Sequence, residues 1–247
     1  MRDATPQTIY LKDYKVPEFL IDKTKLVFDL NEDYCQVNSV LTIRRNPASQ
    51  SSSASLFLHG GKDLDLQCIE VDGFLLNDDQ YQRTEDGLII NQVPDNAVIN
   101  IEVLIKPHLN TTMMGLYKSR TMYCTQCEAE GFRNITFYLD RPDVMSEFTT
   151  KLIADKHQFP VLLSNGNPLE QGELDNGRHF VTWHDPFKKP AYLFALVAGD
   201  LSVVEDSFTT CTNREILLQI FVESKDLNKC DHAMLSLKNS MRWDEQT

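Results

Sequence analysis

Apolar and polar residues alternate along most of the first 200 residues, which is the pattern of half-buried β-strands. In residues 20–30 one face carries Leu20, Asp22, Thr24, Leu26, Phe28 and Leu30, and in residues 98–105 one face carries Ile99, Ile101, Val103 and Ile105. Shorter extended segments are expected at 37–43, 55–58, 64–71, 74–76, 87–90, 148–154, 160–163, 178–183 and 192–198. Strands at this spacing, with no helical pattern between them, predict a mainly β fold of the antiparallel sandwich or barrel type.

Glycine-containing pairs separate several of these segments. Asp72-Gly73 predicts a tight hairpin turn, and Asn165-Gly166 and Asn176-Gly177 predict two further turns. Glycine and asparagine both tolerate the positive φ that such turns require. The alternation and the turns therefore support the same all-β interpretation.

The pattern changes after residue 200. Residues 215–224 form one more alternating strand, with Ile216, Leu218, Ile220 and Val222 on one face. Spacings of three and four then connect Leu227, Cys230, Met234, Leu237 and Met241, which predicts an amphipathic helix with Ser224 or Asp226 as its N-cap. No glycine, asparagine or proline follows Met241 before Thr247. Such an ending suits either a chain interrupted inside an element or an ordinary frayed helix.

Charge and cysteine content narrow the classes of function. The 247 residues include 24 basic and 36 acidic side chains, a net charge of −12 at pH 7. This balance disfavours non-specific nucleic-acid binding and docking on an anionic membrane. The start, Met1 to Thr8, lacks the apolar core of a signal peptide, and six cysteines are too few for a disulfide scaffold of this size. We therefore expect a cytoplasmic protein with reduced thiols.

Most catalytic signatures are missing from the sequence. It contains no H-E-x-x-H, G-x-S-x-G or G-x-G-x-x-G motif and no phosphate-binding loop. His179 and His184 lie five residues apart, which would place them on opposite faces of a strand. Neither the motif search nor the histidine spacing therefore predicts a metal centre or a catalytic nucleophile.

One segment, Cys124 to Arg133, does concentrate chemically active side chains. Its Cys124-x-x-Cys127 spacing suits a metal or redox site, but no second such pair supplies the remaining ligands of a structural zinc. If the segment is extended, Gln126, Glu128 and Glu130 project on one side. An amide and carboxylates on one edge could hold an ammonium group, form a glycosidase-like acid/base pair, or be a solvated polar face.

Four longer runs resemble the N-terminal part of the bacterial aminopeptidase N family of gluzincin zinc aminopeptidases. They are Cys124 to Phe132, Tyr138 to Asp143, Leu163 to Asn167 and Leu193 to Asp200. The tail, Ser236 to Glu245, resembles the opening of that family's catalytic domain. The match is collinear and extends over nearly the whole chain.

The resemblance implies a β-rich, saddle-like domain over residues 1–200 and the truncated start of a thermolysin-like zinc peptidase domain over residues 201–247. It also implies that Glu128 anchors the α-amino group of a peptide substrate and that Gln126 lines the first side-chain pocket. The family's zinc ligands and catalytic tyrosine have no counterpart in this sequence. We therefore expect one zinc ion in the full-length parent and neither zinc nor catalysis in these 247 residues.

The implied partners are peptides with a free N-terminus and the remaining catalytic and C-terminal domains of the same chain. A rival hypothesis from another class is a non-enzymatic β-sandwich interaction module, which the strand content, the acidic charge and the missing catalytic motifs would also suit. A third, glycan-binding or glycosidase interpretation uses Glu128 and Glu130.

Overall fold

The computed structural model describes residues 8, 10–51 and 53–247, so the expectations about the first seven residues lie outside it. Its largest sheet has the order β13 (Asn167–Glu173), β14 (Arg178–Pro190), β11 (Met145–Asp155), β1 (Phe19–Leu30), β2 (Cys35–Arg45), β8 (Asn96–Ile105), β4 (Asp65–Val71) and β5 (Phe74–Leu75). A four-stranded sheet has the order β12 (Val161–Ser164), β15 (Leu196–Gly199), β10 (Met122–Gln126) and β9 (Gly115–Ser119).

Two smaller sheets contain the remaining strands. One has the order β3 (Leu56–His59), β7 (Gly87–Ile90) and β6 (Tyr81–Arg83), and the other is the hairpin of β16 (Ser202–Thr209) and β17 (Glu215–Val222). The helix α1 spans Asp231–Gln246, and single 3-10 segments are η1 (Leu11–Asp13), η2 (Pro107–Leu109), η3 (Phe132–Asn134), η4 (Asp175–Gly177), η5 (Ala191–Leu193) and η6 (Ser224–Lys229). No helix of the described residues is long and apolar enough to cross a membrane.

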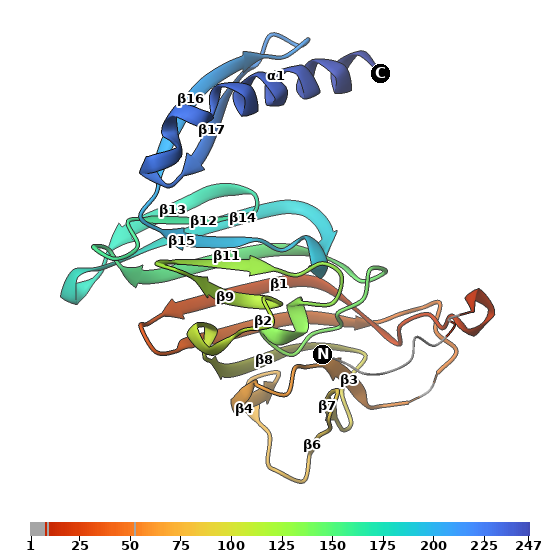
Figure 1. Cartoon of the computed structure of the whole chain (residues 1–247). Coiled ribbons are helices and arrows are strands. Elements are labelled where there is room, and N and C mark those ends of the chain that lie inside the picture. Colours follow the sequence, from red (N-terminus) through yellow and green to blue (C-terminus); the bar gives the residue numbers. More distant parts are fainter. Residues whose placement is uncertain (1–7, 9, 52) are drawn as a thin grey trace.

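The mainly β fold class is confirmed, although the large sheet is mixed instead of purely antiparallel. The strand β1 pairs in antiparallel fashion with β2 on one side, but it pairs in parallel with β11 on the other, Thr24 lying opposite Phe148. A parallel pairing needs a long connection between its strands. Here the residues between β1 and β11, coloured from orange through yellow to green in Figure 1, form most of the other strands of the body.

The predicted face of β1 is correct only over its second half. Leu26, Phe28 and Leu30 are buried as expected, but at the start Phe19 and Ile21 are buried instead of Leu20 and Asp22. A β-bulge lies between Ile21 and Lys23. One extra residue inverts the alternation of side chains, so the same sheet face is lined by odd positions before the bulge and by even positions after it.

One hydrophobic core joins the three larger sheets, and aromatic side chains occupy its centre. The Phe132 ring contacts those of Tyr138, Phe148 and Phe194 with centroid separations of 4.8, 6.1 and 5.3 Å. Phe28, on β1, stacks on Phe194 at 5.8 Å. These rings place the segment around Phe132 between the large sheet and the four-stranded sheet.

Several elements differ from the sequence-based prediction in extent. The expected strand 192–198 is shorter, because the 3-10 segment η5 takes up its start and β15 begins at Leu196. The strands β6, β9, β13 and β16 were not predicted at all. The β13 residues are nearly all exposed, so they lack the buried face that produces an alternating pattern.

The β16–β17 hairpin and α1 form an arm that stands away from the rest of the molecule (Figure 1). Its own core consists of Phe208, Leu218 and Met234. The predicted N-caps are wrong: α1 starts at Asp231 after η6, and no side chain caps its first turn. Of the expected apolar stripe, Cys230 and Met234 are buried, whereas Leu227 and Leu237 remain 39% and 37% exposed.

We predict that Phe132→Ala will lower the free energy of unfolding by about 3–5 kcal/mol, because a fully buried ring at the centre of the aromatic cluster leaves a cavity when it is removed. Urea denaturation followed by tryptophan fluorescence measures this change. The control is Phe74→Ala, since the Phe74 ring is 77% exposed and its removal should change stability by less than about 0.5 kcal/mol. Equal effects of the two substitutions would contradict the assignment of the core.

Candidate functional site

The extended conformation of the cysteine-rich segment ends at Gln126, and the chain then turns over residues 128–131. The Gly131 amide donates a hydrogen bond to the Cys127 carbonyl at 2.8 Å, and η3 begins at Phe132. The turn is tight, because a Cβ atom on Gly131 would lie 2.4 Å from the Gln126 carbonyl oxygen. Gln126, Glu128 and Glu130 therefore do not continue along one strand face, as an extended segment would have placed them.

Arg133 and Asp140 fix the far side of this turn. The Arg133 Nε donates to Asp140 Oδ2 at 2.9 Å, and the Arg133 backbone amide donates to the same oxygen at 3.1 Å. A third bond runs from the guanidinium to the Asp140 carbonyl at 3.1 Å. Only 2% of the Asp140 side chain is exposed. Asp140 therefore accepts hydrogen bonds from both the backbone and the side chain of Arg133.

The carboxylates of Glu130 and Glu128 are in different situations. Glu130 pairs with the Arg133 guanidinium at 3.3 Å. Glu128 is exposed, and its carboxylate makes no ion pair or hydrogen bond with any described side chain. The Gln126 Nε2 instead donates to the Glu128 carbonyl at 3.2 Å, which brings that amide next to the turn. The turn thus offers one unpaired carboxylate beside an amide, an arrangement that can accept hydrogen bonds from a cation.

The two cysteines of the segment, Cys124 and Cys127, are free thiols. Cys127 is 3% exposed, and its burial, with a smaller effect from the Asp140 charge, raises the pKa of its thiol. A thiol that stays protonated is a poor nucleophile and a poor metal ligand. All six cysteines are free, and among the described residues no three His, Cys, Asp or Glu side chains gather as metal ligands.

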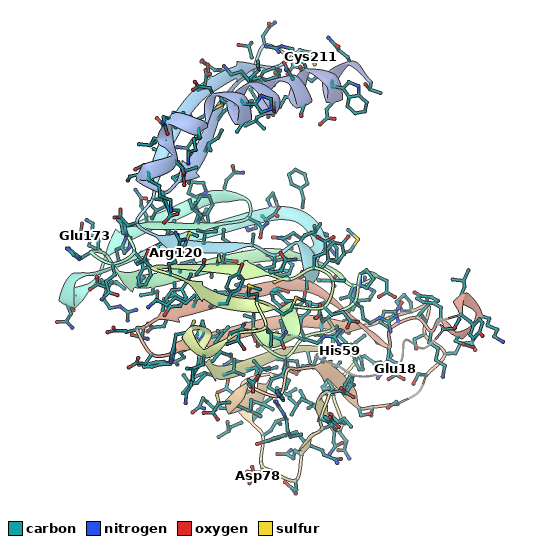
Figure 2. The ribbon with its side chains drawn as sticks, in the orientation of Figure 1. Glu18, His59, Asp78, Arg120, Glu173 and Cys211 are labelled. Carbon is teal, nitrogen blue, oxygen red and sulfur yellow. The ribbon has the colours of Figure 1, made fainter. Side chains whose placement is uncertain are left out.

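The site lies at one end of the β9–β10 hairpin. In Figure 2 the label of Arg120 marks the tip of this hairpin, and Gln126 occupies the opposite end of β10. There Gln126 pairs with Gly115, the first residue of β9. The sequence did not reveal that Arg133 holds this turn through Asp140. The two residues are seven positions apart, with Arg133 inside a 3-10 turn, and no periodic pattern predicts their contact.

Comparison with known proteins identifies the family. Residues 22–193 match the family model of the Peptidase M1 N-terminal domain. The match extends over more than half of the chain, so the chain belongs to this family. The similarity to aminopeptidase N-type proteins inferred from the sequence motifs is confirmed.

Individual relatives agree with this assignment. The chain is 48% identical over 244 residues to aminopeptidase N of Escherichia coli and 46% identical over 246 residues to aminopeptidase N of Caulobacter vibrioides. It covers 27% and 28% of the lengths of these two relatives. The crystal structure of Legionella pneumophila aminopeptidase A in complex with aspartic acid superposes with a TM-score of 0.90 at 36% identity, over 96% of this chain and 28% of that chain.

A more distant structure shows the fold alone. The M1 zinc metallopeptidase of Deinococcus radiodurans superposes with a TM-score of 0.68 at 13% identity, over 84% of this chain and 48% of that chain. The β architecture is therefore retained at low sequence identity.

We predict that Asp140→Ala will destabilise the chain by about 3–5 kcal/mol, because it removes the buried carboxylate that accepts from both the Nε and the backbone amide of Arg133. Glu130→Ala removes the other acid that contacts Arg133, but the Glu130 side chain is 64% exposed, so the expected loss is below about 1 kcal/mol. Guanidinium denaturation curves of both variants test this difference. Similar losses would show that Asp140 does not fix the turn.

Proposed function

We propose that this chain is the N-terminal, substrate-recognising part of a zinc metallo-aminopeptidase that removes single amino acids from peptide N-termini. The carboxylate of Glu128 binds the α-ammonium group of the substrate, and Gln126 lines the pocket for the first side chain. The observation that carries this proposal is the unpaired, exposed carboxylate of Glu128 on a braced turn, next to the Gln126 amide.

An exposed carboxylate suits this task for a physical reason. A peptide N-terminus is an ammonium with three N–H donors, and charge-assisted hydrogen bonds to a carboxylate are about twice as strong as neutral ones. The glycosidase alternative needs two available carboxylic acids, but Glu130 is engaged by Arg133. Ammonium binding uses only the carboxylate that the fold leaves unpaired.

The described residues do not offer a ligand set that fits zinc. In our proposal the metal, and the acid-base chemistry that goes with it, belong to the part of the parent protein outside this sequence. Residues 1–200 then form the recognition domain and residues 201–247 the first part of the peptidase domain. The arm of β16, β17 and α1, with its small separate core, supports a boundary near residue 200.

We also propose a cytoplasmic location, peptides as substrates, and no role for nucleic acids or membranes. Six free cysteines suit a reducing compartment. The net charge of −12 disfavours phosphate-rich partners. The further domains of the parent chain are the expected partners of the arm.

In the full-length parent, Glu128→Gln should lower kcat/KM for aminoacyl substrates by about 10- to 100-fold, because a neutral amide cannot balance the ammonium charge. Steady-state kinetics on an aminoacyl chromogenic substrate measures the loss. Glu130→Gln is the matched control, a glutamate of the same turn that pairs with Arg133, and it should retain parental kinetics. Unchanged kinetics of the Glu128 variant would refute the amine assignment.

The isolated chain of 247 residues should release no amino acid from the same substrate when zinc is added. Purified chain and full-length parent are assayed side by side at equal concentration. Zinc-dependent turnover by the isolated chain would disprove the proposal that the zinc site lies outside these 247 residues. A parent without an H-E-x-x-H motif after Thr247 would instead favour the non-enzymatic interaction module.

A further inference from the structure

The first residue of β9, Gly115, packs directly against the turn that carries Glu128. Gln126 and Gly115 are paired across the β9–β10 hairpin. A Cβ atom on Gly131 would lie 3.1 Å from the Gly115 amide nitrogen, so the turn and the start of β9 are in backbone contact. Residues 110–114 therefore lead into β9 beside the candidate amine site.

Asn110 holds this segment in one shape. Its Nδ2 donates to the carbonyls of Met114 and Leu116, each at 2.9 Å. Its Oδ1 accepts hydrogen bonds from the backbone amide and the hydroxyl of Thr112, at 3.0 and 2.8 Å. Three of these four bonds are to backbone atoms, and they fix the backbone on both sides of Met113.

The residue held in this way is apolar and exposed. The Met113 side chain is 60% exposed, and its φ is 56°, in the left-handed region that methionine rarely adopts. Such a conformation costs on the order of 1 kcal/mol and persists only where the surrounding bonds impose it. The fold therefore maintains an unfavourable backbone state that keeps a flexible thioether at the surface beside the Glu128 turn.

An unpaired carboxylate on one segment and an exposed apolar side chain two residues before the strand that contacts it match the chemistry of one ligand class. The first residue of a peptide carries its ammonium and its side chain on the same Cα atom. Methionine adapts to apolar groups of different shape, which suits a surface that accepts several side chains. The Glu128 carboxylate thus complements the ammonium group of an N-terminal apolar residue, and Met113 complements its side chain.

We propose that Met113 contacts the side chain of the first substrate residue and determines the preference for large apolar residues there, with Asn110 as its positioning residue. This inference rests on the proposed amine-binding function of Glu128. It adds a specificity determinant on a different segment of the chain, outside the run from Cys124 to Arg133.

The test is Met113→Ala in the full-length parent, with peptides that vary in the first residue. We expect kcat/KM to fall about fivefold for leucine and phenylalanine at that position and to stay unchanged for alanine, because only large side chains lose buried contact area. The control is Leu75→Ala, at the edge strand β5, since Leu75 is 64% exposed and its removal should affect no substrate. An equal loss on all first residues, or no loss, overturns the proposal.

A second peptide series keeps alanine first and varies the second residue. If Met113→Ala changed the relative kcat/KM values only in this second series, the assignment of Met113 to the first side chain would be overturned. Glu128→Gln is measured on both series in parallel. If Glu128→Gln leaves all kinetics unchanged, the proposed function itself fails. If Glu128→Gln impairs every substrate while Met113→Ala affects large and small first residues equally, only the inference about Met113 fails.

Asn110→Ala should raise KM for the leucine and phenylalanine substrates more than for alanine and leave kcat unchanged. A purely structural role would instead lower the amount of folded enzyme and reduce the rate on every substrate equally. Thr112→Val removes the hydroxyl that donates to Asn110 Oδ1 and accepts from the Met114 amide, but it keeps the other Asn110 bonds, so it should give a smaller shift of KM in the same direction. A uniform loss of kcat in both variants contradicts the positioning role.

Discussion

The ion pair between Arg133 and Asp140 is the constraint on which the rest of the candidate site depends. A nearly buried carboxylate accepts bonds from both the backbone and the side chain of Arg133, while the preceding residue, Phe132, is locked among the aromatic rings of the core. The turn that starts at Glu128 is therefore anchored at its far end by charge and by packing. Because Arg133 takes up Glu130 as well, Glu128 is the carboxylate that remains available to a ligand.

The fold class could be predicted because long strands with one buried face have alternating apolar and polar residues in the sequence. The segment 98–105 is the clearest case, since the four residues of its predicted face, Ile99, Ile101, Val103 and Ile105, are all buried. Two of the features that escaped this reasoning have a local cause. The bulge after Ile21 inverts the pattern without any residue that signals it, and β13 has no buried face to alternate. Pairing partners, including the parallel contact of β1 with β11, are set by tertiary packing and not by local pattern.

For the site, the sequence alone offered three chemical interpretations of Gln126, Glu128 and Glu130, and only the resemblance to a known family favoured one. What separates the two glutamates is local geometry. The turn closed by the Gly131 amide sends Glu130 toward Arg133 and leaves Glu128 in solvent. Spacing rules for strands could not anticipate this, because the segment leaves the extended state after Gln126. The Asn110 bonds that shape the neighbouring segment are equally invisible in a one-dimensional pattern.

The central position of β1 also has a consequence for how the chain is made. Among the long strands β1 is the first to be synthesised, yet one of its neighbours, β11, ends only at Asp155 and is itself covered by β14, which ends at Pro190 (Figure 1). Contacts between segments far apart in sequence slow folding, because the loop between them must close first. During synthesis β1 can pair with β2 early, but its other edge stays open until most of the body has left the ribosome. An open strand edge invites pairing with other chains, so this half-built sheet is the stage at which the nascent protein most needs protection from aggregation.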